Sequence, residues 1–492
     1  MHLPRIVLLA FLSACLPTLW AADNARDLSP LIDRLDAIRQ EDAVPAFSVV
    51  LVDRDAVLMT ATRGYADLAE RRPAGPDTRF RIGSITKTFT GMALLLAESA
   101  GEVSLDRAIP ELIADPPYEN PWVGTHPITL AQLLEHTAGF QDWVGDEWNL
   151  NDPLPLAAAL AYRPGSRTAR WPPGFHSSYS NSGAGVAARV FELLTDSDFE
   201  SFVDERIFTP LGMDTATFLA QGENLELLAT GYDSDGTSII PYWHVIFRPA
   251  AAISLRPDDM AALIRLLLNR GRHDGDRFLT PDLVSRMEHP RTTLAARAGL
   301  DYGYGLGIYQ WQHNGHSLFG HGGDGDGYLA HFGYSLESGR GYFVVINVFR
   351  YPPLRRLRAE LEDWVTAGLR TPSPVIADAS DLTRYTGTYR QVTKRFGPLP
   401  PTATVEVLER QGRLYTKGGD SRERPLLPVA EPMFRRPGQT VATTIFVTGG
   451  DGRRYLQGPI GNFVRIDDGR TPPQSPPPNE APAAAPSPAR ED

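Results

Sequence analysis

Strand-like segments stand on both sides of a long helical middle in this chain, and this pattern limits the folds that the chain can adopt. Residues 47–65 have the pattern of a strand hairpin, and residues 303–349 hold short runs of Tyr, Phe, Val and Ile separated by glycines. Apolar residues recur at helical spacing in segments 28–40, 84–100, 129–136, 182–195, 198–207, 257–270, 281–287 and 353–369. Strands that flank a helical middle predict one sheet built from both ends of a domain.

The rest of the sequence divides into smaller regions. A chain of 492 residues exceeds the size at which a single core keeps growing, so a second module is expected. Residues 371–380 look like a linker, and residues 381–468 contain alternating β segments without a good helix. The Pro- and Ala-rich tail over 469–492 has no periodic apolar face, which predicts a disordered extension. The larger domain is thus expected to span residues 23–370.

Residues 1–22 have the features of a secretory signal peptide. A basic residue precedes an apolar stretch over 6–12, and small residues follow up to position 22. An uncleaved membrane anchor would need about 20 apolar residues, and Pro17 interrupts a stretch that is already short. Residues 12–15, Leu-Ser-Ala-Cys, also resemble a lipoprotein box, in which Cys15 would be lipidated and tether the protein to a membrane. We expect an exported protein, periplasmic or secreted.

The charge and the cysteine content exclude several classes of function. The formal net charge is −11, from 48 Lys and Arg and 59 Asp and Glu residues, and no run of basic residues stands out. Proteins that bind nucleic acid need a basic stripe, so no nucleic-acid partner is expected. Cys15 is the only cysteine, so the chain has neither a disulfide framework nor a thiolate zinc cluster. Nothing in the sequence predicts an oligomeric state.

Ser84 and Lys87 stand three residues apart, at the start of a long buried helix that is expected to begin at Ser84. This spacing places the hydroxyl and the ammonium on the same helix face, where they can touch. A serine hydroxyl becomes a good nucleophile when a neighbouring base takes its proton, and a desolvated lysine has a lowered pKa that suits this role. By itself the pair also fits a helix start that carries a solvated lysine.

Further segments accompany this pair in a characteristic order. Residues 80–89 read Phe-Arg-Ile-Gly-Ser-Ile-Thr-Lys-Thr-Phe, residues 132–139 read Gln-Leu-Leu-Glu-His-Thr-Ala-Gly, residues 179–181 read Tyr-Ser-Asn, and residues 321–323 read His-Gly-Gly. With these motifs the chain resembles the β-lactamase and penicillin-binding-protein superfamily over about residues 28–368. The match is best with its class C β-lactamase, D-alanyl-D-alanine carboxypeptidase, D-aminopeptidase and esterase branch. The resemblance implies an α/β fold in which an antiparallel sheet flanked by helices is joined to an all-helical subdomain.

The resemblance assigns a role to each motif residue. Tyr179 would lie beside Ser84, where its phenolate, or a proton shared with Lys87, accepts the serine proton. The alternative is an ordinary packed tyrosine. Asn181 would donate a hydrogen bond to a substrate amide carbonyl, and it could also cap the helix that follows. The backbone N–H groups of Ser84 and Asp324 would form the oxyanion hole.

His321 stands where the β-lactamases of this superfamily carry Lys or, less often, Arg. Near neutral pH a histidine is only partly cationic, so we expect it to hold a substrate carboxylate less firmly than a lysine would. His-Gly-Gly at this place looks more like the D-aminopeptidase, peptidase and esterase members. Gly322 and Gly323 would let the strand approach the nucleophile and the substrate closely. Asp324 and Asp326 could favour a substrate ammonium, although Asp-Gly-Asp-Gly is also a turn-forming run.

Four histidines lie close together in the sequence, at positions 313, 316, 321 and 331. A metal site is an alternative interpretation of this group. No acidic ligand motif accompanies these histidines, and the third motif already accounts for His321. We therefore expect neither a metal nor a cofactor.

The second module resembles a lipocalin-like C-terminal domain that some relatives carry, which implies a small antiparallel β-barrel. Residues 381–389 are similar to its opening strand and residues 463–465 to its closing one. In such relatives the barrel packs beside the catalytic domain and can lend a loop to the site, and residues 395–400, Arg-Phe-Gly-Pro-Leu-Pro, are the candidate here. The sequence favours a role of the module in stability or oligomerisation.

Together these residues predict a serine hydrolase that forms an acyl-enzyme on Ser84 and hydrolyses a small peptide, amide or ester. Because of His321, a D-amino-acid peptidase or esterase fits better than an efficient β-lactamase. The alternative is a penicillin-binding sensor that is acylated with little turnover. A catalytically dead scaffold is disfavoured, since Ser84, Lys87 and Tyr179 are all present. The same constellation serves several chemistries, so no sequence argument selects the scissile bond.

Overall fold

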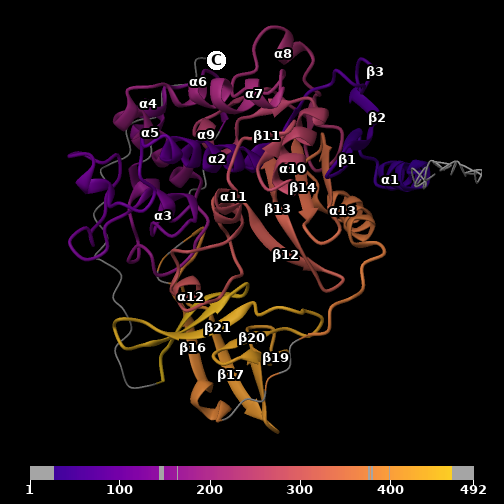
Figure 1. Cartoon of the computed structure of the whole chain (residues 1–492). Helices are drawn as coiled ribbons and strands as arrows, with labels where there is room; N and C mark the ends of the chain where they lie inside the picture. Colours follow the sequence, from indigo (N-terminus) through magenta and orange to yellow (C-terminus); the bar gives the residue numbers. More distant parts are fainter. Residues whose placement is uncertain are drawn as a thin grey trace, which may run out of the picture.

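The computed structural model describes residues 27–142, 149–162, 164–374, 377, 381–397, 399 and 401–467. The predicted signal peptide over 1–22, with Cys15, and the predicted tail over 469–492 lie outside the described residues, as does part of the predicted linker. Within the described ranges, no helix combines the length and the apolar character that crossing a membrane requires. These ranges form a large domain that contains a sheet and many helices, followed by a smaller barrel (Figure 1).

Antiparallel strands from both ends of the large domain form one seven-stranded sheet (Figure 1). Their order across the sheet is β12 (Tyr309–His313), β13 (His316–Gly325), β14 (Tyr328–Ser335), β15 (Arg340–Ile346), β1 (Ala46–Asp53), β2 (Val57–Asp67) and β3 (Arg72–Pro73). The N-terminal hairpin joins the C-terminal strands where β1 pairs with β15, with Val50 opposite Phe343. This topology confirms the predicted sheet built from both ends of the domain.

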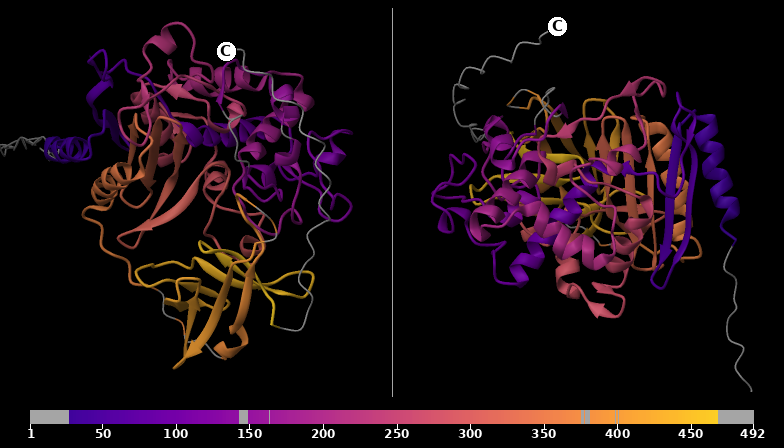
Figure 2. Two further views of the ribbon diagram at one scale, coloured as in Figure 1. Left: turned by 180° about the vertical axis from the view of Figure 1, so that it is seen from behind. Right: turned by 90° about the horizontal axis from the view of Figure 1, so that it is seen from above.

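Alternate side chains of the sheet pack against helices on its two faces. On one face, Val49 and Val344 belong to a cluster that α1 (Ser29–Glu41) and α13 (Tyr351–Thr366) complete. The view from above in Figure 2 shows α1, in indigo, along the outer side of the sheet. On the other face, Val50 joins the large core, to which α10 (Met260–Leu268) contributes. Successive strand residues point to opposite faces, so the long apolar runs of β1 and β15 fit strands that are buried on both sides.

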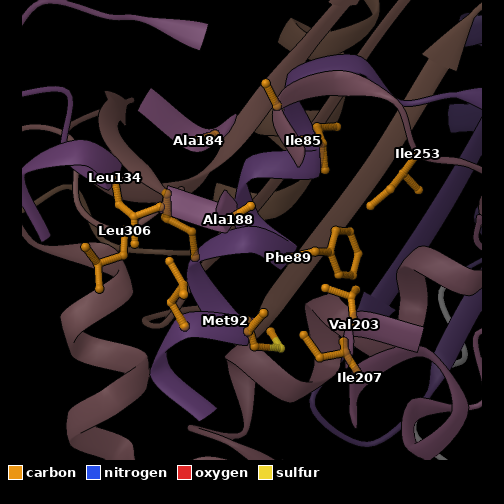
Figure 3. Close-up of a cluster of buried hydrophobic side chains, with 14 of the residues drawn as sticks. Ile85, Phe89, Met92, Leu134, Ala184, Ala188, Val203, Ile207, Ile253 and Leu306 are labelled. Atoms are coloured by element: carbon orange, nitrogen blue, oxygen red, sulfur yellow. The ribbon is translucent and has the colours of Figure 1, made fainter. Parts of the chain in front are cut away.

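The helical part of the large domain surrounds α2 (Thr86–Ser99), which is buried along most of its length. Phe89 and Met92 of α2 pack among Ala188, Val203 and Ile207 in a continuous apolar core (Figure 3). The other α-helices that the structure describes in the helical part are α3 (Leu130–Leu134), α4 (Leu156–Tyr162), α5 (Asn181–Thr195), α6 (Phe199–Val203), α7 (Thr209–Leu211), α8 (Glu223–Glu226), α9 (Arg248–Ala251), α11 (Pro281–Glu288) and α12 (Leu294–Arg297). Because α2 is enclosed in this way, the residues at its N-terminus stand on a rigid support.

Short two-stranded sheets connect the loops around this core. They are β4 (Phe80–Arg81) with β9 (Ser254–Leu255), β5 (Asn149–Leu150) with β8 (His244–Val245), β6 (Gly231–Tyr232) with β7 (Ile239–Ile240), and β10 (Arg272–His273) with β11 (Asp276–Arg277). The first of them matters for the site, because β4 ends three residues before Ser84 and its pairing with β9 anchors that segment.

The residues after the linker form a closed antiparallel barrel. Its strands are β16 (Gly387–Gln391), β17 (Thr404–Arg410), β18 (Arg413–Lys417), β19 (Glu423–Ala430), β20 (Met433–Arg435), β21 (Thr444–Thr448), β22 (Arg454–Gly458) and β23 (Gly461–Arg465). β16 pairs with β23 and closes the barrel, with Tyr389 opposite Arg465. A separate apolar cluster that includes Leu414, Phe434 and Phe446 fills the interior. The structure thus confirms the predicted C-terminal antiparallel β-barrel.

Candidate active site

Ser84 lies in a 3-10 turn, η1 (Gly83–Ile85), between β4 and α2. The prediction that the α-helix begins at Ser84 is wrong, because α2 begins at Thr86. Gly83 has a φ of 53°, in the left-handed region, and a Cβ on it would lie 2.6 Å from the carbonyl oxygen of Asp324. Glycine permits both the left-handed conformation and the close contact. The turn thus brings the backbone next to Ser84 against β13, the strand that carries the third motif.

The ammonium of Lys87 is held by hydrogen bonds on several sides. Its Nζ donates to Ser84 Oγ at 3.1 Å, to Asn181 Oδ1 at 2.6 Å and to the carbonyl oxygen of Ala250 at 2.8 Å. Only 2% of Lys87 is exposed, so the alternative of a solvated lysine is wrong. Burial lowers the pKa of Lys87 to about 7. Near neutral pH the neutral amine, which can accept the Ser84 proton, is therefore well populated.

Tyr179 lies beside the same pair. The Lys87 ammonium is 4.9 Å from the centre of the Tyr179 ring, and the centre of the His136 ring is 4.2 Å from it. Burial raises the pKa of Tyr179 above its usual value, while a hydrogen bond with the Ser84 side chain acts in the opposite direction. Tyr179 is thus a protonated phenol in the resting site. Lys87, rather than a Tyr179 phenolate, is the group that loses its proton near pH 7.

Asn181 opens α5 and connects Lys87 to an acidic residue that has no motif of its own. The cap position of α5 is Ser180, so the alternative in which Asn181 caps the helix is wrong. The Asn181 backbone N–H and Nδ2 donate to Oδ1 and Oδ2 of Asp142, each at 3.0 Å. These two bonds leave Asn181 Oδ1 turned toward Lys87, from which it accepts a hydrogen bond.

β13 passes close to the turn that holds Ser84 because the strand carries glycine at position 323. A Cβ on Gly323 would lie 1.8 Å from the carbonyl oxygen of Ile82, which no side chain tolerates. A Cβ on Gly83 would in turn lie 2.7 Å from the amide nitrogen of Asp324. The backbones next to Ser84 and at Asp324 therefore lie side by side, as an oxyanion hole made from their N–H groups requires.

His321 is buried on β13, with 3% of its surface exposed. Its Nδ1 contacts the carbonyl oxygen of Gly322, and its Nε2 lies 2.7 Å from the hydroxyl of Tyr304. A carbonyl oxygen only accepts, so Nδ1 carries the proton and Nε2 accepts from Tyr304. Burial lowers the pKa of His321 to about 3, and Lys87 acts in the same direction. His321 is thus neutral near pH 7, which corrects the expectation of a partly cationic side chain, because the packing that desolvates the ring is not visible in the sequence.

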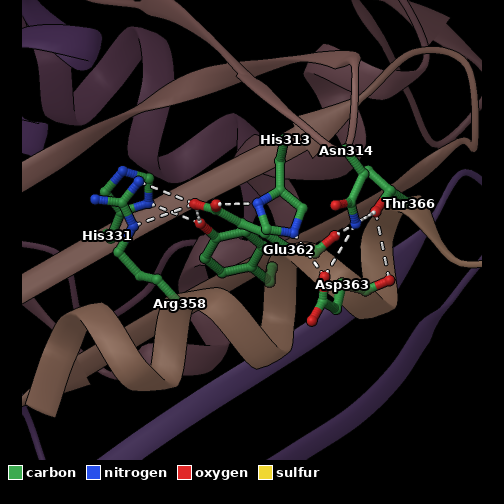
Figure 4. A network of polar contacts seen from close by, with 8 residues as sticks. His313, Asn314, His331, Arg358, Glu362, Asp363 and Thr366 are labelled. Carbon is green, nitrogen blue, oxygen red and sulfur yellow. Dashed lines mark hydrogen bonds and ion pairs between the residues drawn. The ribbon is translucent and has the colours of Figure 1, made fainter. Parts of the chain in front are cut away.

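The other histidines of the group have partners of their own, and Figure 4 shows His313 beside Glu362 and Asp363. His331 lies between the hydroxyls of Tyr309 and Tyr342, at 3.2 and 2.9 Å. His313 and His316 each pair with acidic side chains. In the part of the chain that the structure describes, no three His, Cys, Asp or Glu side chains are grouped so that they could hold a metal ion.

Arg395, from the loop between β16 and β17 of the barrel, reaches the site. Its Nη2 lies 2.9 Å from Asp142 Oδ2, and its Nε donates to the same oxygen at 3.0 Å. Its guanidinium carbon is 4.4 Å from the centre of the Tyr179 ring. Gly397 of the same loop accepts a hydrogen bond from Gln141 at 2.6 Å. Arg395 and Phe396 of the candidate loop therefore line the site, in addition to any role of the barrel in stability or oligomerisation.

The site residues line a cleft of about 850 Å³, a volume within the range of small-molecule sites. Ser84, Tyr179 and Asn181 lie on its wall, together with His321 and Arg395. The structure thus brings together segments that are far apart in the large domain with a loop of the barrel.

Asp324 and Asp326, the candidates for an ammonium site, also line the cleft. The carboxylate of Asp324 accepts a hydrogen bond from the hydroxyl of Tyr351 at 2.7 Å, and that of Asp326 accepts one from Asn149 Nδ2 at 2.6 Å. Both carboxylates are thus oriented by neutral donors of the protein.

Sequence reasoning did not single out Asp142, Tyr304 or His136 as members of the site. His136 lies inside the segment over 132–139, and Asp142 follows that segment by three residues. Tyr304 lies in a Tyr-Gly-Tyr-Gly run over 302–305, where the glycines are the available signal of a close backbone approach.

Known proteins match both the sequence and the fold. The family model described as Beta-lactamase matches residues 31–367. A D-aminopeptidase of Cereibacter sphaeroides is 28% identical over 334 residues, which cover 65% of this chain and 60% of that protein. Protein flp of Staphylococcus aureus is 25% identical over 243 residues, which cover 47% of each. The chain thus spans about 60% of the length of the D-aminopeptidase relative.

Solved structures share the fold at lower identity. The octameric penicillin-binding protein homologue from Pyrococcus abyssi has a TM-score of 0.58 and 21% identity, over 89% of this chain and 100% of that one. SurE has a TM-score of 0.58 and 21% identity, over 89% of this chain and 98% of its own. These likenesses concern the fold alone. Since the family model covers most of the chain, including every motif residue of the cleft, the protein belongs to the beta-lactamase family.

Proposed function

We propose that this protein is a serine hydrolase that forms an acyl-enzyme on Ser84 and hydrolyses a small peptide, amide or ester. The observation that carries the proposal is the 3.1 Å contact between the buried Lys87 ammonium and Oγ of Ser84, and Ser84 lies on the wall of the cleft. Because burial lowers the pKa of Lys87 to about 7, a neutral amine is available as the base. Nucleophilic catalysis by a serine needs such a base within hydrogen-bonding reach.

The proposed steps follow from the positions of these groups. Ser84 Oγ attacks the substrate carbonyl carbon while its proton passes to Lys87 Nζ. The backbone N–H groups of Ser84 and Asp324 stabilise the oxyanion that forms. Tyr179, a protonated phenol, relays the proton from Lys87 to the leaving nitrogen or oxygen, which departs. A water molecule then attacks the carbonyl carbon of the acyl-enzyme and gives a proton to Lys87. Lys87 passes a proton to Ser84 Oγ as the bond between that oxygen and the acyl carbon breaks, which releases the acid and regenerates the Ser84 hydroxyl.

The substrate that we propose is a D-amino-acid peptide, amide or ester rather than a β-lactam that is turned over efficiently. Support comes from His321, which is neutral near pH 7 because burial lowers its pKa to about 3. It offers no positive charge to a substrate carboxylate, unlike the Lys or Arg that β-lactamases carry at this place. The similarity to D-aminopeptidases supports the same class, although the chain spans about 60% of the length of that relative.

An activity screen tests this proposal. The purified protein is assayed with D-amino-acid amides, D-Ala-D-Ala peptides, short p-nitrophenyl esters and a chromogenic cephalosporin, and Ser84→Ala is the control. We expect steady turnover of a D-amino-acid amide or an ester, slow turnover of the cephalosporin, and no turnover by the control. A burst that stops at one equivalent would instead identify an acylated sensor. Turnover by Ser84→Ala would contradict the proposed nucleophile.

A further inference from the structure

A continuous chain of polar contacts connects the C-terminal barrel to the nucleophile. Arg395 Nε and Nη2 contact Asp142 Oδ2 at 3.0 and 2.9 Å. Asp142 accepts two hydrogen bonds from Asn181, each at 3.0 Å, and Asn181 Oδ1 accepts one from Lys87 at 2.6 Å. Lys87 Nζ lies 3.1 Å from Ser84 Oγ. A barrel residue thus stands at the far end of the chain that holds the proposed base.

Asp142 needs a cationic partner because its side chain is only 2% exposed. A buried carboxylate that loses its paired charge is strongly disfavoured. Within the described ranges, Arg395 is the residue that forms an ion pair with Asp142. The two hydrogen bonds that Asp142 accepts from Asn181 fix both the first residue of α5 and the orientation of the Asn181 amide. Loss of the guanidinium would therefore disturb the amide that holds Lys87.

The loop that carries Arg395 is held against the large domain at more than one point. Gln141, the neighbour of Asp142, donates to the carbonyl oxygen of Gly397 at 2.6 Å. The Arg395 guanidinium also lies over the Tyr179 ring, 4.4 Å from its centre. Stacking and the ion pair together define the place of the guanidinium.

The body of the barrel docks on the segment that leads into Tyr179. Gln457 Nε2 donates to the carbonyl oxygen of Phe175 at 2.9 Å, and Asn462 Nδ2 donates to that of Ser177 at 2.7 Å. Gln457 lies on β22 and Asn462 on β23, whose paired strands form a rigid base for these contacts. The barrel is thus fixed next to the second motif, independently of the Arg395 loop.

We infer that Arg395 is a positioning residue for the reaction, because it keeps the Asn181 amide and the Lys87 amine in catalytic geometry. It acts through Asp142, so the site is complete only when the barrel is in place. The inference rests on the proposed role of Ser84 as the nucleophile.

Arg395 also contributes to the electrostatics around Lys87. Burial is the largest cause of the lowered pKa of Lys87, and the Arg395 guanidinium lowers it further, whereas Asp142 and Asp324 raise it. The other titratable side chains that face the amine are uncharged near pH 7, namely Tyr179, His136 and His321. Removal of the Arg395 charge leaves the two carboxylates to act on Lys87, which raises its pKa.

The test compares Arg395→Gln with two controls. Arg395→Lys keeps the charge, and Arg413→Gln removes an exposed arginine of β18 that does not line the cleft. The value of kcat/KM on a neutral p-nitrophenyl ester is measured from about pH 5 to about pH 9. Rates are divided by the number of sites that a fluorophosphonate labels, so that misfolded protein is not counted.

For Arg395→Gln we expect kcat/KM per labelled site to fall about tenfold or more, and the acid limb of the profile to move up by about half a pH unit or more. Arg395→Lys should keep the limb at its native pH, and Arg413→Gln should match the native protein. Because Arg395 acts through Asp142, the double variant Arg395→Gln/Asp142→Asn should lose much less activity than the product of the single losses.

Several results would overturn the inference. A merely structural role of Arg395 would lower the melting temperature or the number of labelled sites and leave the acid limb unmoved. Multiplicative losses in the double variant would also contradict it. If Ser84 is labelled in the native protein and the limb is unmoved in Arg395→Gln, only the inference fails. If Ser84 of the native protein is not labelled at all, the proposed function fails, and the inference fails with it.

Discussion

Asn181 Oδ1 accepts a hydrogen bond from Lys87 Nζ at 2.6 Å, although the two residues are 94 positions apart in the chain. The contact joins α2, which follows the turn that holds Ser84, to the first residue of α5. The carbonyl oxygen of Ala250 binds the same ammonium at 2.8 Å. Lys87 is therefore held within hydrogen-bonding distance of Ser84, as the proposed proton transfer requires.

Lys87→Ala and Tyr179→Phe should each lower turnover by at least about 100-fold, since each removes a group from the proposed path of the proton. The double variant should be much less damaged than the product of the two losses, because both side chains serve one proton transfer. Steady-state kinetics on an ester measure these losses, with thermal unfolding of each variant as the control for folding. Independent, multiplicative losses would contradict a shared task.

The pH dependence of kcat/KM should report the protonation of Lys87, whose pKa is lowered by burial to about 7. Only the neutral amine accepts the serine proton, so activity should fall about tenfold per pH unit below that pKa and level off above it. Because a neutral ester does not ionise in this pH range, the fall of kcat/KM on the acid side reports a group of the enzyme. A limb near about pH 10, as for a solvated lysine, or near about pH 4, as for a carboxylate, would assign the base to a different group or environment.

His321→Lys should improve acylation by carboxylate-bearing substrates such as cephalosporins and leave neutral esters little changed. Because burial lowers the pKa of His321 to about 3, the native side chain is still neutral in mildly acidic solution, and the advantage of the lysine should persist there. His321→Gln, which keeps a neutral side chain, is the matched control. Equal effects on both kinds of substrate would mean that His321 instead positions the Gly-rich strand through its contact with Tyr304.

Gly323→Ala should disable the oxyanion hole. The added Cβ would lie 1.8 Å from the carbonyl oxygen of Ile82, so β13 must move away from the nucleophile turn. We expect kcat to fall about 100-fold or more, which is the effect of removing one oxyanion donor. Gly325→Ala is the control on the same strand, because a Cβ there meets no atom within 4 Å, and it should keep most of the activity. Equal losses in the two variants would argue against the close approach of β13.

The sheet and its main helices could be predicted because their signals are local. The apolar runs of β1 and β15 each indicate a strand, and a turn leads from β1 into β2. Only the pairing of β1 with β15 required the rule that strands on both sides of a helical middle meet in one sheet. Ser84 and Lys87 could be paired from their spacing, since one helical turn brings them together. Tyr179 and His321 could be predicted as site residues from the order of the motifs, and the structure places both on the cleft wall.

The remaining features depend on packing between distant segments. Asp142 and Arg395 are 253 positions apart and lie in different domains, so no periodicity relates them. The neutral state of His321 follows from its burial against Tyr304, and burial is a property of the folded chain. The start of α2 at Thr86 rather than at Ser84 follows from the 3-10 turn, which the local apolar spacing does not distinguish from a helix.

Covalent labelling of Ser84 tests the central claim most directly. The native protein is treated with a fluorophosphonate or a β-lactam probe, and the modified residue is located by mass spectrometry. We predict that Ser84 is modified and no other residue, because Lys87 Nζ lies 3.1 Å from its hydroxyl oxygen and activates it. Ser84→Ala should abolish the labelling. A label on another residue, or labelling that survives Ser84→Ala, would contradict the account.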